Sequence, residues 1–287
     1  FQASLAMHTG SSTIPLPSLG SWLSYGLGTL NPNLPPYVVL AEHLPYAGAQ
    51  VWDSSFLPPQ HQGVRLIPGH DPIPHLKPAV ESVRLRDLEQ RMLQDLNEEH
   101  SRLRPEDLKL QARMQSFETA RGMMNDAPEV FDFTRESART LDNYGIPPGD
   151  RTSFAWQCLT ARRLLERGVR VVELVDTGAG DNWDAHGDLV KNHTHHAGRT
   201  DKPIAALIQD LKQRGMLEET LIVWGGELGR QPTAENQEGT GRDHNSYGFT
   251  MWLAGGGIRG GVSFGETDEL GSAAVVNPVH VRNLHST

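Results

Sequence analysis

Two short apolar runs separated by a helical pattern constrain the fold of this chain most. Residues 169–175 form a β-branched run, and residues 221–224 form a second apolar run. Between them, residues 201–214 repeat apolar side chains at helical spacing, and Gly215 ends the pattern. Strand, helix and strand in this order predict a βαβ unit with parallel strands and a right-handed crossover. The chain is therefore expected to be an α/β protein.

The α/β pattern extends over residues 151–287. A helix is predicted from Ser153 to Arg167, with Gly168 as its C-cap. Residues 249–254 supply a further strand. This part of the chain also carries the polar motifs that point to a functional site.

Residues 80–145 have a different pattern and are expected to form a helical insertion. Apolar side chains recur at helical spacing in two runs, namely Leu85, Leu88, Met92 and Leu96, and then Leu110, Met114, Phe117 and Met124. Pro105 is expected in the first turn of the second helix. Thr134 is expected to begin a third helix that ends near Gly145. We interpret the apolar stripes as helix-packing surfaces.

Residues 1–80 are rich in proline, glycine and serine. A short helix is predicted at residues 18–28 and a strand at residues 37–41. Proline lacks a backbone N–H and fixes φ, so the proline-rich residues 42–78 are expected to form a long ordered loop.

Composition limits the classes of function. With 287 residues, 37% of them hydrophobic, the chain can bury a core, and we treat residues 1–287 as a single domain. The net charge of -9, without a block of Lys and Arg, argues against a nucleic-acid partner. No apolar run approaches the roughly 18 residues that span a membrane. Cys158 is the single cysteine, so no internal disulfide is expected.

Three polar motifs contain the oxygen and nitrogen donors that divalent metals prefer. They are Asp-Asn-Trp-Asp-Ala-His-Gly-Asp at 181–188, Gly-Gly-Glu-Leu-Gly-Arg at 225–230 and Gly-Arg-Asp-His at 241–244. The first two follow predicted strands, and ligands of open α/β sheets collect beyond the carboxyl ends of the strands. We therefore expect the motifs to meet at one edge of the sheet. A divalent cation there would relieve the repulsion between the carboxylates.

Each candidate residue also has a simpler interpretation. Asp184 alternatively caps the following helix. Arg230 pairs with Glu227 or holds an anionic ester group. Asp243 either binds the metal or orients the ring of the neighbouring histidine. A separate group of histidines comprises His193, His195 and His196, and we interpret it as a solvated helix entry rather than a metal site.

Taken together, the motifs resemble a known family. The resemblance rests on residues 158–169, Trp-Asp-Ala-His at 183–186, residues 210–215, Trp-Gly-Gly-Glu-Leu-Gly-Arg at 224–230, Gly-Arg-Asp-His at 241–244 and Leu-Ala-Gly-Gly-Gly at 253–257. These segments resemble an uncharacterised bacterial family, abundant in planctomycetes, within the alkaline phosphatase and sulfatase superfamily. The resemblance covers most of the chain.

The resemblance implies a fold and an activity. The fold is a three-layer helix–sheet–helix sandwich of alkaline-phosphatase-like type with a mostly parallel sheet. The activity is metal-dependent hydrolysis of sulfate or phosphate esters, with one or two divalent ions (Zn, Ca, Mg or Mn). The substrates implied are small anionic esters or sulfated polysaccharides. Relatives are often exported, so a periplasmic or secreted location is implied, although no signal peptide is visible here.

The resemblance also implies roles for particular residues. The expected metal ligands or their supports are Asp184, His186, Glu227, Asp243 and His244, and the expected anion-binding residues are Arg230 and Arg242. Leu228 stands where the superfamily has a histidine, so one expected ligand is lost. Met7, His8, Thr9 and Gly10 resemble the end of the sulfatase nucleophile segment. The nucleophile is then expected at or just before Phe1, with the first strand upstream of the sequence, and it stays unassigned.

Two functions of different classes follow from these observations. The first is the metal-dependent ester hydrolase, with hydrolysis of another bond such as an amide as a variant. The second is a catalytically degenerate protein that uses the same fold as a binding or structural module, which the lost histidine favours. Bound metal separates them, because the first requires an ion at the three motifs.

Overall fold

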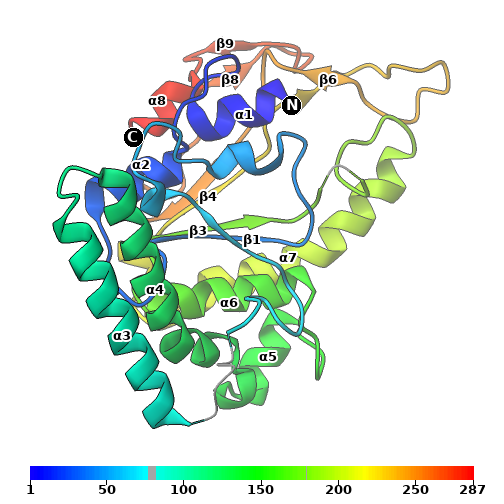
Figure 1. Ribbon diagram of the computed structural model, residues 1–287. Coiled ribbons are helices and arrows are strands. Elements are labelled where there is room, and N and C mark those ends of the chain that lie inside the picture. The colour runs from blue at the N-terminus through cyan, green and yellow to red at the C-terminus, as the bar shows by residue number, and fades with distance from the viewer. Residues whose placement is uncertain (77–81, 179) are drawn as a thin grey trace.

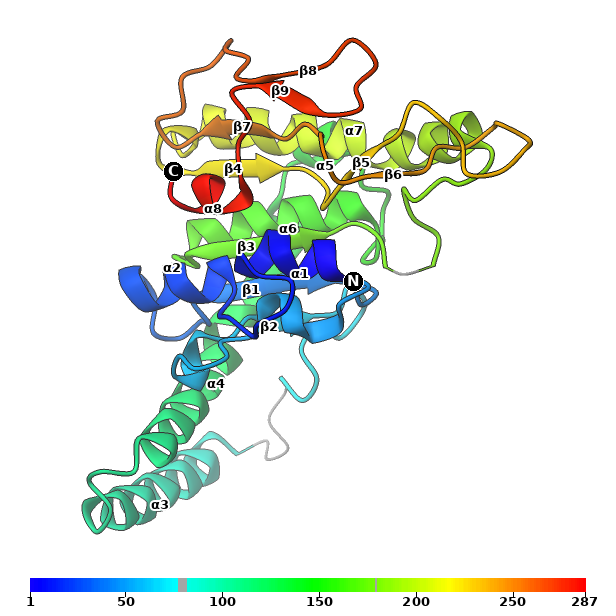
Figure 2. The same ribbon diagram turned by 90° about the horizontal axis from the view of Figure 1, so that it is seen from above.

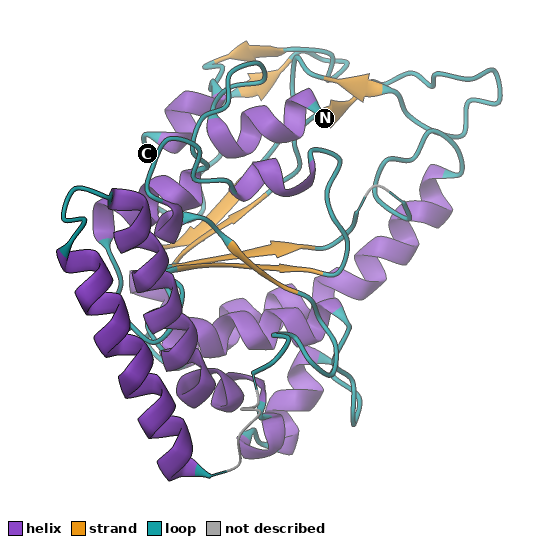
Figure 3. Cartoon of the chain, viewed as in Figure 1, coloured by secondary structure: helices purple, strands orange, loops and turns teal. Residues whose placement is uncertain are grey.

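The computed structural model describes residues 1–76, 82–178 and 180–287. Its centre is a parallel sheet of three strands in the order β2–β1–β3. These strands are β1 (Tyr37–Ala41), β2 (Val64–Leu66) and β3 (Val171–Val175). Helices cover both faces of this sheet (Figure 1, Figure 3).

The other elements of the described residues complete a mixed helix and sheet protein. The helices are α1 (Gln2–Thr9), α2 (Leu19–Leu27), α3 (Val83–Arg102), α4 (Leu108–Phe131), α5 (Ala138–Tyr144), α6 (Phe154–Glu166), α7 (Leu189–Gln213) and α8 (Val281–His285), with short 3-10 helices η1 (Gly48–Trp52), η2 (Pro59–His61), η3 (Phe133–Arg135) and η4 (Leu217–Glu219). The remaining strands form antiparallel pairs, β4 (Leu221–Trp224) with β7 (Trp252–Gly255), β5 (Gly229–Arg230) with β6 (His244–Asn245), and β8 (Glu266–Thr267) with β9 (Ala274–Val276).

The alternation of side chains along β1 builds a core on each face of the sheet. Val38 and Leu40 point to one face, where they pack with residues of α4 and α6 such as Trp156. Tyr37 and Val39 point to the other face, where they pack with Trp52 and residues of α1 and η1. Both faces of β1 are therefore buried, as the continuous apolar sequence of this strand requires.

The predicted βαβ pairing is wrong for the strands that the structure describes. The strands themselves form at 171–175 and 221–224, but β4 pairs antiparallel with β7, and β3 pairs with β1. Leu174 of β3 and Ile222 of β4 nevertheless pack against the same cluster of α5, α6 and α7 side chains. The pattern of apolar residues identifies a strand, but the neighbouring strand with which it pairs depends on contacts between segments that are distant in the sequence.

The first 76 residues are more regular than expected. The helix at 18–28 is confirmed as α2, with the Ser18 side chain accepting a hydrogen bond from the Ser21 N–H and Gly28 ending it. The strand at 37–41 is confirmed as β1. Within the expected loop at 42–78, η1, η2 and β2 form, so the expectation of a loop without regular elements is wrong. Prolines are tolerated there because Pro59 lies in the first turn of η2. Residues 77 and 78 of that loop lie outside the described residues.

The helical region contains a hairpin of α3 and α4 that projects from the rest of the molecule (Figure 2). The stripe on α3 is not a packing surface, because Leu85, Leu88, Met92 and Leu96 are between 52% and 61% exposed. Pro105 precedes α4 instead of entering its first turn, since Asp107 is the N-cap. The third helix, α5, begins after Ser137 rather than at Thr134, and Gly145 ends it as expected.

Helix α7 begins at Leu189, well before the predicted start at residue 201. Its first three turns carry polar side chains and lack the apolar repeat on which the prediction rested. Pro203 lies inside this helix. The histidines at 193, 195 and 196 are consequently on the helix. Their interpretation as a solvated helix entry is wrong for His196, which is fully buried, whereas His195 is exposed.

Within the described residues, none of the helices combines the length and the apolar character that a membrane crossing requires.

Candidate metal centre

Two loops and one short strand pair meet at the amino-terminal end of α7. The loop between β3 and α7 carries Asp184 and His186, and the β5–β6 pair sets Arg230 opposite His244. The backbone N–H of Arg242 donates to the carbonyl of Ala185 at 3.0 Å, which ties the two segments together. The polar motifs at 181–188 and 241–244 therefore meet, as the sequence predicted.

Gly241 permits this close approach. A Cβ atom built at this position would lie 2.0 Å from the carbonyl oxygen of His186, far inside van der Waals contact. Only glycine lets the two backbones come this close without displacement. The close packing of the two loops thus requires glycine at the first position of the Gly-Arg-Asp-His motif.

Three donor atoms converge at the junction. The distance from Asp184 Oδ1 to His244 Nε2 is 2.9 Å, that from Asp184 Oδ1 to His186 Nε2 is 3.0 Å, and the two Nε2 atoms are 3.2 Å apart. Cis donors at about 2.1 Å from one ion are about 3.0 Å apart, so this spacing matches adjacent ligands of an octahedral ion. One carboxylate and two imidazoles form a donor set that suits zinc, manganese or iron.

A second group of donors surrounds the first and shares His186. Glu235 Oε2 lies 2.6 Å from His186 Nδ1, and Asp243 belongs to the same group. His186 Nδ1 is buried and makes no hydrogen bond in the described structure, but the adjacent carboxylate favours a proton there and leaves the Nε2 lone pair free for a metal. Glu235 was not among the predicted site residues, because it lies in a polar loop with no strand or glycine turn beside it. The Asp243 carboxylate does not orient the ring of His244; it accepts a hydrogen bond from the His244 backbone N–H at 2.7 Å.

Arg230 pairs with Asp184 and not with Glu227 in the described structure. Its Nη1 atom lies 2.5 Å from Asp184 Oδ1. Partial burial opposes ionisation of Asp184, but Arg230 and His244 outweigh it and hold the pKa of this carboxyl below its ordinary value. Asp184 is not the cap of the following helix, since the N-cap of α7 is Asp188. Arg242 Nη1 instead donates to the carbonyl of Gly241 at 2.6 Å.

Glu227 has different neighbours. The hydroxyl of Ser4 on α1 donates to Glu227 Oε1 at 3.2 Å, and Glu227 is absent from the groups of convergent donors found among the described residues. Its charge also acts on His8, which contacts Glu173 Oε1 at 2.8 Å. The structure therefore separates Glu227 from the three donors around Asp184 and places it in a polar cluster at α1.

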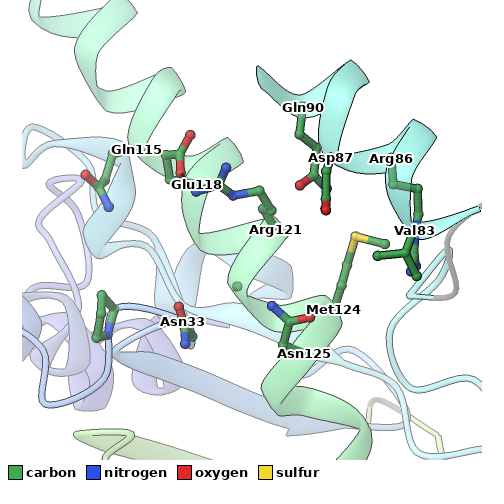
Figure 4. Close-up of a pocket in the computed structure, with 12 residues that line it drawn as sticks. Asn33, Val83, Arg86, Asp87, Gln90, Gln115, Glu118, Arg121, Met124 and Asn125 are labelled. Carbon is green, nitrogen blue, oxygen red and sulfur yellow. Dashed lines mark ion pairs between the residues drawn. The ribbon is translucent and has the colours of Figure 1, made fainter. Parts of the chain in front are cut away.

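A cavity elsewhere contains none of the predicted site residues. It has a volume of about 480 Å³ and lies between α3 and α4 (Figure 4). Charged and amide side chains line most of it, among them Arg86, Asp87 and Glu118, and Arg121 pairs with Glu118 at 2.7 Å. Since its charged groups balance one another, this hollow offers no convergent donor set like that of Asp184, His186 and His244.

Comparison with known families gives one result. A family model described as a protein of unknown function (DUF1501) matches residues 1–287. The chain belongs to the DUF1501 family. No curated protein and no solved structure matches it. The expected membership of an uncharacterised family is thus confirmed.

Proposed function

We propose that this DUF1501 protein is a metal-dependent hydrolase of sulfate or phosphate esters, with an alkaline-phosphatase-like arrangement of its layers. The observation that carries the proposal is the convergence of Asp184 Oδ1, His186 Nε2 and His244 Nε2 within 3.2 Å of one another. Three such atoms need a shared cation or proton between them, and a divalent ion satisfies all three at once.

The residues around these donors support the proposal. A divalent ion held by Asp184, His186 and His244 would polarise the ester oxygen and stabilise developing negative charge. Glu235 would orient His186 from its Nδ1 side, and Asp243 would add a further carboxylate donor, because both lie in the group that shares His186. Arg230 is the nearest guanidinium, and its planar fork suits a sulfate or phosphate group. The donors are partly exposed, with His244 at 48% of its side chain, so a substrate can reach them.

Metal content tests the proposal directly. Purified protein is dialysed against zinc or manganese and then against metal-free buffer, and bound metal is measured by mass spectrometry. The wild-type protein should keep at least one ion per chain, and His244→Ala should keep one ion fewer. His100→Ala is the matched control, because His100 is an exposed histidine on α3 whose contacts are with Arg104. Wild-type protein that keeps no metal would contradict the proposal.

Activity is then measured on three nitrophenyl substrates, a sulfate ester, a phosphate ester and an anilide. Turnover of either ester that disappears in His244→Ala supports the proposed reaction. Turnover of the anilide alone would reassign the hydrolase to amide bonds. If His244→Ala retains ester turnover, the assignment of this site as the active site is contradicted.

One observation favours the second candidate, a binding or structural module without catalysis. The guanidinium of Arg230 already neutralises Asp184 at 2.5 Å, in the place where an ion would do so. If the arginine replaces the ion, His244→Ala leaves the metal content of the wild-type protein unchanged, and Arg230→Met gains one equivalent. If the site is a metal centre, the wild type and Arg230→Met both hold the ion, and Arg230→Met loses affinity for anionic esters only.

A further inference from the structure

The first turns of α7 contain a buried histidine whose ring nitrogen has no hydrogen-bond partner. The His196 side chain is 0% exposed, and its Nε2 atom makes no hydrogen bond in the described structure. Trp183 covers the ring, with the two ring centres 5.2 Å apart. A polar atom left unpaired in this way is unfavourable unless a ligand satisfies it.

Two further donors lie where His196 Nε2 points. Asp181 Oδ1 is 3.4 Å from His196 Nε2, and Asp181 Oδ2 is 3.7 Å from His195 Nε2. All three residues offer a ligand atom within 4.8 Å of one another. Donors bound to tetrahedral zinc at 2.0–2.1 Å lie roughly 3.3–3.4 Å apart, and the Asp181–His196 distance already matches this spacing. Rotation of the exposed His195 side chain would bring the third donor to the same ion.

We propose that Asp181, His195 and His196 form a second divalent-cation site, of the tetrahedral zinc class, that fixes the loop after β3 to α7. Asp181 belongs to the loop that also carries Asp184, whereas both histidines belong to α7. An ion shared by loop and helix holds the loop in the position that brings Asp184 to His244. Water completes the coordination on the open side, where the side chains of Asp181 and His195 are 75% and 57% exposed.

Arg199 regulates this site. Its Nη2 atom lies 3.1 Å from His196 Nδ1 and 3.1 Å from Asp176 Oδ1. A guanidinium only donates hydrogen bonds, so without an ion His196 carries its proton on Nε2. When Nε2 binds a metal, the proton moves to Nδ1, and Arg199 must turn away from it. Its side chain is 38% exposed, so it can turn toward solvent while it keeps its contact with Asp176.

The experiment is zinc titration by calorimetry in the His244→Ala background, which removes a donor of the first site. One equivalent of zinc should still bind. Adding Asp181→Asn or His195→Ala should weaken that binding at least about tenfold, since each removes one ligand. Both positions are exposed, so neither change should disturb the fold. Adding Arg199→Ala should tighten binding severalfold, because the competing donor is gone. Adding His100→Ala is the control and should leave the titration unchanged.

The outcomes separate this site from the one around Asp184. Zinc binding that Asp181→Asn and His195→Ala leave unchanged would overturn the second site, as would a His244→Ala protein that binds no zinc. A wild-type protein that binds no more zinc than His244→Ala would overturn the first site and leave the second intact. If Arg199→Ala binds zinc no more tightly than its parent, the role given to Arg199 is overturned.

Discussion

At the scale of single residues, neighbouring carboxylates stabilise the protonated ring of His8 beside the central sheet. Burial disfavours the charged ring, but the hydrogen bond and charge of Glu173, together with the charge of Glu227, outweigh it and raise the pKa of His8. Tyr37 donates to the other oxygen of Glu173, and the carbonyl of Ser4 accepts from His8 Nδ1. The protonated form of His8 therefore stabilises the folded state.

This cluster predicts a pH dependence of stability. Because the folded pKa of His8 lies above its unfolded value, its contribution is complete below about pH 6.5 and is lost as the pH rises through the folded pKa. Melting temperatures are compared between pH 6 and pH 9 for the wild type and His8→Gln, which donates without titrating. The advantage of the wild type should shrink with rising pH. An advantage that grows with pH would contradict the assigned charge.

Gly241 gives a second prediction at this scale. A methyl group there would meet the His186 carbonyl, so Gly241→Ala should lower the free energy of unfolding by about 1–3 kcal/mol, the usual cost of overpacking. Gly187→Ala is the matched control in the same loop, because its Cβ would meet nothing closer than the Thr240 hydroxyl at 3.9 Å, and it should cost less than about 0.5 kcal/mol. Urea unfolding measures both. Equal costs would show that the two loops do not approach as described.

At the scale of elements, the sequence predicted the presence of helices and strands better than their partners. Ser18 and Ser153 stand at the predicted starts of α2 and α6, where each serine oxygen accepts a hydrogen bond from a backbone N–H within its own turn. Such local contacts are readable from neighbouring residues. The pairing of β4 with β7 and the polar start of α7 at Leu189 were not readable, because both depend on contacts between distant segments. The same distinction holds at the site, where Asp184, His186 and His244 were predicted to meet, whereas Glu235 was missed.

The α3 stripe provides a test between elements. Leu88 on α3 is 52% exposed, whereas Leu159 on α6 is 0% exposed and lies in a core cluster. Leu159→Ala should therefore lower the free energy of unfolding by about 2–5 kcal/mol, because it leaves a cavity. Leu88→Ala should cost less than about 0.5 kcal/mol. Chemical unfolding of the two variants checks this. A large cost for Leu88→Ala would mean that the stripe is covered in solution.

At the scale of the whole molecule, contacts between distant segments join the two ends of the chain. The Arg282 side chain donates to the carbonyl of Gly10, and His285 Nε2 contacts the carbonyl of Met7 at 2.7 Å, so α8 lies against α1. On the opposite face, charges link α6 to α7 and to the segment before α5. Arg162 is at the centre, with its side chain 2% exposed and atoms 2.7 Å from Glu136, 2.6 Å from Glu166 and 3.0 Å from Asp210.

The central position of Arg162 gives the last prediction. Arg162→Ala removes the buried partner of Glu166 and Asp210, which keep only the half-exposed Arg214 as a cationic partner, whereas Glu136 keeps the buried Arg163. Breaking a buried ion pair costs up to about 3–5 kcal/mol. Arg167 is the matched control at the C-cap of the same helix, because it pairs with the exposed Glu129 at 3.2 Å. Arg167→Ala should cost less than about 1 kcal/mol, as surface pairs do. Thermal and urea unfolding of the two variants measure the difference. Similar costs would mean that solvent screens the Arg162 contacts, and α6 and α7 would then be held together by their apolar faces alone.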